Sequence, residues 1–153
     1  MSSTYVRFRD RGFEANDAAL EVLLALLVRE IDRLRDAPDW LREIREEWNI
    51  QSTAGFSFGV MPGLDHFVNS EEKRQTIIAL AGKALQKLES YGPVITRDQL
   101  NALETGGEDS TFTCDAATSE FIRPARFFIR LLEGALEPWE SDSRFDVVQE
   151  DGL

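Results

Sequence analysis

The nine residues from Leu20 to Val28 constrain the fold more than any other part of the chain. Eight of them are apolar, and Glu21 is the one exception. At 100° per residue in an α-helix, the apolar side chains of this run point almost all round the helix axis. Such a helix must be enclosed by other elements, and the run is too short to cross a bilayer, which needs about 20 apolar residues. The sequence therefore predicts a mainly α protein with a buried central helix over 17–35.

Helical patterns recur further along the chain and predict a bundle of about five helices in a single domain covering 1–153. The other four helices are expected at about 38–49, 70–91, 97–103 and 119–136. Either Asn16 or Asp17 is expected to cap the central helix. Thr96 and Gln99 have the spacing of a capping box at the start of the short fourth helix. Pro124 predicts either a kink or a fresh start in the last helical region.

Short stretches of alternating or β-branched composition are candidates for β structure near 4–9, 56–60 and 111–114. The first of these makes 1–15 an N-terminal arm or strand. The residues 51–65 form the longest irregular stretch, because several glycines, serines and a proline there disfavour a helix. Long loops inside compact domains are often functional, so this loop is a candidate site.

The charge balance is strongly acidic. The chain has 28 Asp and Glu residues against 17 Lys and Arg residues, a formal net charge of −11. Because phosphate binding needs a basic surface, this balance argues against a nucleic-acid partner. The segments 93–117 and 137–153 together hold eleven of the acids, and the second is an acidic C-terminal tail. We expect these segments to attract a basic protein partner.

The single cysteine, Cys114, excludes an intramolecular disulfide and a zinc site built from several cysteines. The N-terminal arginines are not followed directly by the apolar core of a signal peptide. No apolar run is long enough to span a membrane. A reducing cytoplasm is therefore the expected compartment, with no membrane partner.

No catalytic, cofactor-binding or metal-ligating motif stands out, so no cofactor and no metal are expected. The only histidine, His66, could act as a general base beside Asp65, but a surface histidine fits the pattern better. A nucleophile–base pair of Cys114 and His66 lacks any supporting local motif. The acidic residues Glu43, Glu46 and Glu47 could join Asp39 as metal ligands. With Arg42 and Arg45 beside them, they fit a solvated helix face better than a metal site.

Three functions remain open. The first is an acidic, non-catalytic domain that binds and inhibits a basic partner. Small immunity proteins that neutralise bacterial toxins are similar in size, acidity and lack of catalytic motifs, although no shared motif supports more than an analogy. The second is a small hydrolase-like enzyme with a site around His66 and the 51–65 loop. The third is a homodimeric structural or scaffold protein.

The first hypothesis is preferred, with the chain as a monomer or a homodimer. Acidic residues would steer the encounter with a basic partner, and aromatic residues would anchor the complex. The residues expected to contact the partner are Glu108, Asp109, Asp115, Trp139, Glu140, Asp142, Phe56 and Phe58.

Overall fold

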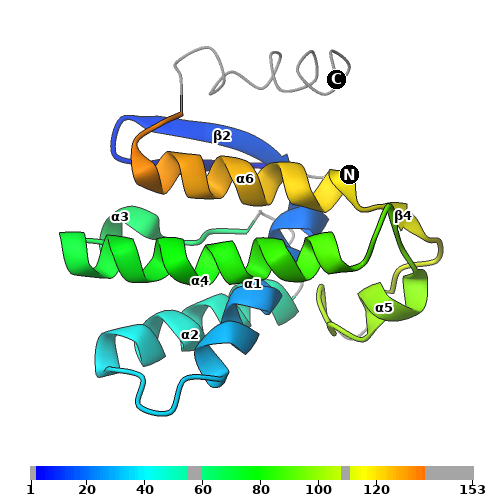
Figure 1. Ribbon diagram of the computed structural model, residues 1–153, viewed down its shortest axis with the longest axis horizontal. Coiled ribbons are helices and arrows are strands. Elements are labelled where there is room, and N and C mark those ends of the chain that lie inside the picture. The colour runs from blue at the N-terminus through cyan, green and yellow to red at the C-terminus, as the bar shows by residue number, and fades with distance from the viewer. Residues whose placement is uncertain (1–2, 55–59, 108–110, 137–153) are drawn as a thin grey trace.

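The structure, a computed structural model, describes residues 3–54, 60–107 and 111–136 of the chain (Figure 1). These residues are mainly helical, as predicted, with a few short antiparallel strands. In chain order the described elements are β1 (Ser3–Phe8), β2 (Arg11–Asn16), α1 (Asp17–Asp32), α2 (Asp39–Thr53), α3 (Leu64–Phe67), α4 (Glu71–Ser90), β3 (Val94–Ile95), α5 (Arg97–Asn101), β4 (Ala116–Ala117) and α6 (Ser119–Glu133). A bundle of about five helices agrees only roughly with this arrangement, and the extent of the domain stays a prediction.

Helix α1 is buried on nearly every side, as its apolar run predicts. The side chains of Leu20, Leu24 and Leu27 are fully enclosed. The Asn16 side chain caps the helix, since its Oδ1 accepts the backbone N–H of Ala18 at 2.8 Å. The expected end at residue 35 is wrong, because α1 ends at Asp32 where charged residues reach the surface.

Four elements enclose α1. Helices α2, α4 and α6 and strand β2 all contact it. Figure 1 shows α4 and α6 running side by side, with α2 on the far side of α4 from α6. One continuous cluster of buried apolar residues joins these elements. The apolar surface of α1 is thus covered by two helical layers and by the hairpin that precedes it.

The N-terminal segment forms an antiparallel hairpin, with Val6 opposite Phe13 in the register. The strand predicted near 4–9 is confirmed as β1, whereas β2 was not anticipated. Side chains on one face of the hairpin, including Phe8 and Phe13, are buried. The Phe13 ring meets the Phe127 ring of α6 edge to face, with 5.7 Å between centroids. The hairpin therefore packs on α6 as well as leading into α1.

The other two β predictions fare differently. Of 56–60, only Val60 lies within the described residues, and it is not in a strand. The prediction for 111–114 is wrong, because that segment is irregular and the strand begins at Ala116. The short ladder forms at this later point because Ala116 and Ala117 lie opposite Ile95 and Val94.

Several helix limits also differ from expectation. Helix α2 continues to Thr53, past the predicted end near 49, so the irregular stretch begins later than predicted. The one-turn helix α3 was not expected. Helix α6 runs through Pro124 as a single element, so the helix does not start afresh there. The acidic tail 137–153 lies outside the described residues. None of the helices that the structure describes is both long and apolar enough to cross a membrane.

A pair of leucine truncations tests the burial of α1. Leu24 is fully buried in the core, whereas Leu34 follows the helix and is 37% exposed. We expect Leu24→Ala to lower the free energy of unfolding by about 2–5 kcal/mol, since it removes buried methyl groups and leaves a cavity. Leu34→Ala should change it by less than about 0.5 kcal/mol. Urea denaturation of both variants checks this, and equal losses would contradict the enclosure of α1.

Candidate functional site

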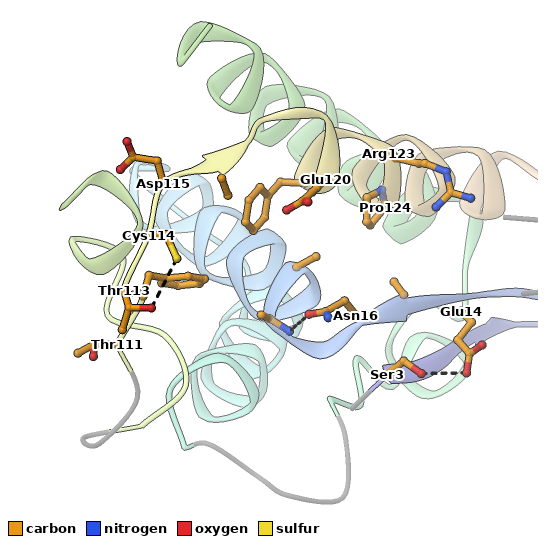
Figure 2. Close-up of a pocket in the computed structure, with 16 residues that line it drawn as sticks. Ser3, Glu14, Asn16, Thr111, Thr113, Cys114, Asp115, Glu120, Arg123 and Pro124 are labelled. Carbon is orange, nitrogen blue, oxygen red and sulfur yellow. Dashed lines mark hydrogen bonds between the residues drawn. The ribbon is translucent and has the colours of Figure 1, made fainter. Parts of the chain in front are cut away.

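A groove of about 620 Å³ opens where the end of β2, the start of α1, the segment 111–116 and the start of α6 meet (Figure 2). Its apolar lining combines small and aromatic side chains from all four of these parts. These apolar residues are Ala15, Ala18, Ala19, Phe112, Ala116, Phe121 and Pro124. Its polar lining is contributed mainly by Ser3, Glu14, Asn16, Thr111, Thr113, Cys114, Asp115, Glu120 and Arg123.

The wall formed by 111–116 is held by groups of α5. The amide of Asn101 clamps Phe112 twice, because its Nδ2 donates to the Phe112 carbonyl at 3.0 Å and its Oδ1 accepts the Phe112 N–H at 2.7 Å. Asp115 Oδ1 accepts the backbone N–H of Arg97 at 2.9 Å. Helix α5 is itself fixed by the predicted capping box of Thr96 and Gln99, which is confirmed. This irregular wall is therefore positioned by specific hydrogen bonds.

The opposite wall is the junction of β2 and α1. Asn16 is both the last residue of β2 and the N-cap of α1, so no loop separates the two elements. On the outer face of the hairpin, Ser3 Oγ donates to Glu14 Oε1 at 3.0 Å. A second groove, of about 380 Å³, shares Thr111 and Phe112 with the first and lies on their α5 side. The 111–116 segment thus separates two hollows.

Acidic groups predominate at the main groove. Glu14, Asp115 and Glu120 line it, against the single guanidinium of Arg123. The guanidinium of Arg123 lies over the Phe127 ring, 4.8 Å from its centroid. Figure 2 shows the Glu120 carboxylate pointing into the groove and the Asp115 carboxylate pointing away from it, at its rim. Within the groove the negative charge is therefore that of Glu120, and the charge of Asp115 lies at the rim.

The main groove also holds a thiol. Cys114 is exposed, and its sulfur lies 3.6 Å from the Thr113 hydroxyl. Among the described residues, no group of three or more His, Cys, Asp or Glu side chains is placed to hold a metal ion. The groove offers apolar contact, hydrogen-bonding groups and negative charge.

Only one of the predicted contact residues can be placed. Asp115 lies at the rim of the groove and is exposed. The remaining seven lie outside the described residues, namely Phe56, Phe58, Glu108, Asp109, Trp139, Glu140 and Asp142. Their role stays a prediction. Sequence reasoning missed Glu14 and Glu120, because only the hairpin and the start of α6 bring them to the same groove as Asp115.

His66 lies on α3, exposed, and lines neither groove. Its ring meets the Phe67 ring edge to face, with 4.9 Å between centroids. The neighbouring Asp65 carboxylate accepts the backbone N–H of Arg9 at 2.7 Å. Neither groove therefore supports an enzymatic site around His66 or a pairing of His66 with Cys114. The enzymatic alternative stays an untested prediction.

A carboxyl pair on α1 is a further feature that the sequence reasoning missed. Asp17 is buried, and its Oδ1 accepts the hydroxyl of Thr4 at 2.6 Å. Glu21 lies one turn later on the same face. Loss of solvation and, secondarily, the nearby charge of Asp17 raise the pKa of Glu21 from 4.5 to about 7. This carboxyl group therefore titrates near neutrality.

Comparison with known proteins gives no relative: no family model, no curated protein and no solved structure matches this chain.

The raised pKa of Glu21 predicts an unusual dependence of stability on pH. Between pH 4.5 and about 7 the folded chain retains a proton on Glu21 that the unfolded chain has released, so stability falls as the pH rises through this window. After allowance for solvent screening of a partly exposed group, we expect a loss of about 1–2 kcal/mol. Glu21→Gln should remove this loss and stabilise the protein at pH 8.

Urea denaturation at pH 5 and pH 8 measures the effect. Glu43→Gln is the matched control, because Glu43 is an exposed glutamate of α2 with no ion pair among the described residues. The same pH dependence in both variants and in the natural chain would show that Glu21 is an ordinary carboxyl group.

Proposed function

We propose that this chain is an acidic, non-catalytic protein-binding domain that binds and inhibits a basic partner, in the manner of an immunity protein or antitoxin acting on a toxin. The observation that carries the proposal is the groove beside α1, where Glu14, Asp115 and Glu120 border an apolar lining. Basic side chains of a partner would pair with these carboxylates while neighbouring apolar side chains fill the groove.

The overall charge of the chain supports the same partner chemistry. With a net charge of −11, the protein repels other acidic proteins and attracts basic ones before contact. The segments 55–59, 108–110 and 137–153 contribute eight of the 28 acids and one of the 17 basic residues. These three segments therefore carry −7 of the net charge of −11.

The groove also offers apolar contacts from which water would be excluded on binding, which long-range charge attraction alone does not provide. Long-range attraction raises the association rate but gives little residence time. The apolar residues of the lining that remain partly exposed are Ala18, Phe112 and Ala116. Apolar groups of a partner that cover these residues would slow dissociation. Inhibition then follows where the bound segment belongs to the basic substrate cleft of the partner.

The test combines capture with a matched pair of double variants. Asp115→Asn with Glu120→Gln removes two charges at the groove, and the amide that replaces the Asp115 carboxylate keeps an oxygen that can accept the Arg97 N–H. Glu43→Gln with Glu72→Gln removes two charges from exposed residues of α2 and α4 outside the groove. Each immobilised protein is exposed to a lysate of the source cells, and bound proteins are identified by mass spectrometry.

We expect a basic protein that is retained by the natural chain and the control variant but binds the groove variant about 3- to 10-fold more weakly. Its association rate should fall as salt rises from about 0.05 to about 0.5 M, because screening shortens the reach of the charges to about one Debye length. The purified partner should lose its activity when the chain binds. Equal binding by both variants, insensitivity to salt, or an unaffected partner activity would refute the proposal.

A further inference from the structure

The outer face of α6 is basic in a protein that is acidic as a whole. Between Phe121 and Leu132 the chain contains Arg123, Arg126 and Arg130 but neither Asp nor Glu. At 100° per residue these three side chains lie on one side of the helix. All three are partly or fully exposed. This face therefore reverses the sign of the net charge of −11 locally.

Two of these arginines are positioned by an aromatic ring. The guanidinium carbons of Arg123 and Arg130 lie over Phe127, at 4.8 and 5.9 Å from its ring centroid. Phe127 is itself fixed, because it is buried and meets Phe13 of β2 edge to face. Stacking uses the flat face of a guanidinium, whereas its five N–H donors lie around its edge. This arrangement suits the binding of carboxylates.

The hairpin adds a fourth basic residue towards the end of this face. Ala15 lines the main groove together with Pro124, and Phe13 meets Phe127 one turn further along α6. Strand β2 therefore runs opposite to α6. Arg11 precedes Phe13 by two residues on the same face of the strand, so it lies towards the C-terminal end of α6. We name four residues the basic seam, namely Arg11, Arg123, Arg126 and Arg130.

The described chain ends beside the basic seam. Gly134 ends α6 in the left-handed conformation, with φ 74°. Its N–H donates to the Leu131 carbonyl at 3.1 Å, and the Ala135 N–H donates to the Arg130 carbonyl at 2.8 Å. These bonds form a Schellman motif, which turns the chain back at the end of a helix. Leu136 is then buried, and Figure 1 shows this end of the described chain turning to the side of α6 on which β2 lies.

We propose that the acidic tail 137–153 folds back and docks along the basic seam of its own chain. The tail contains six acidic residues and one arginine, so its charge of −5 complements the four arginines of the seam. This inference goes beyond the function proposed above and does not depend on it.

The length of the tail is sufficient for this contact. Arg123 precedes Glu133, the last residue of α6, by ten residues, which is about 15 Å along the helix axis. A stretch of about six extended residues spans that distance. The first six residues of the tail already include three acids, Glu137, Glu140 and Asp142. The tail can therefore reach every arginine of the seam.

Tethering favours this occupant over a separate acidic protein or a second copy of the chain. A tail that begins at the end of the seam is present there at an effective concentration of about millimolar. A free acidic protein is instead repelled by the net charge of −11, and a second copy carries the same charge.

Docking would also change the charge around the main groove. Arg123 lines that groove as well as belonging to the basic seam. A tail that reaches Arg123 would offset this positive charge and bring further carboxylates to the rim, near Glu120 and Asp115. The tail and the groove would then form one continuous acidic surface.

The natural cysteine provides a position for the probe. Cys114 is exposed, is the only cysteine of the chain, and lines the same groove as Arg123. A nitroxide on its sulfur broadens the NMR signals of nearby amides, and the reduced label gives the reference. We expect broadening of tail amides in the full chain at about 0.05 M salt and a clear decrease at about 0.5 M, because salt screens the ion pairs.

A matched pair of double variants tests the role of the arginines. Arg123→Gln with Arg130→Gln removes two charges from the seam, and Arg35→Gln with Arg42→Gln removes two exposed charges near the start of α2. We expect the ratio of docked to free tail to fall about 3- to 10-fold in the seam variant and to stay unchanged in the control. If the seam variant does not fold, as judged by circular dichroism, Arg126→Gln replaces it, because its side chain is 59% exposed, with an expected decrease of about twofold.

A mixture of two samples distinguishes docking within one chain from docking between chains. An isotope-labelled Cys114→Ser chain is combined with spin-labelled chains that carry no isotope, and we expect no broadening of its tail signals. Broadening in this mixture would show that the tail docks on another copy and would overturn the proposal. Equal broadening in the two double variants, or none in the natural chain, would also overturn it. The capture experiment above decides the proposed function independently of these results.

Discussion

The enclosure of α1 is the constraint on which the other elements depend. A helix with apolar side chains on nearly every side leaves no face for solvent, so α2, α4, α6 and β2 must each cover part of it. Burial of its leucines supplies much of the hydrophobic free energy available to the fold. That requirement explains why the apolar faces of these elements turn towards α1 and their charged residues lie on the outer helix faces.

The main groove results from the way in which the surrounding elements pack around α1. Around the start of α1 the hairpin and α6 approach from different sides, and the irregular wall 111–116 closes the gap only partly. Asn101 fixes Phe112 through both backbone polar groups, which replaces the ladder that a regular strand would make. The negative groups at the groove are therefore carried by elements whose positions are set by core packing and by these hydrogen bonds.

Much of the helical framework could be predicted from sequence, because the signals are local. The apolar run of α1, its Asn16 cap and the Thr96 capping box of α5 all act within a few residues. The hairpin escaped prediction because its turn uses Arg9 at positive φ, where glycine or asparagine is the usual signal. The groove escaped it too, because Glu14 and Glu120 come together only through tertiary packing, which spacing along one chain does not reveal.

The direct passage from β2 into α1 at Asn16 also fixes the rotational phase between hairpin and helix. One residue inserted after Asn16 would turn α1 by about 100° about its axis and advance it by about 1.5 Å, relative to a strand held against α6. The buried leucine side chains of α1 would then face the wrong neighbouring residues along the whole helix. Insertions and deletions in homologous chains are consequently expected elsewhere. The junction of β2 and α1 should keep its length even where its residues differ.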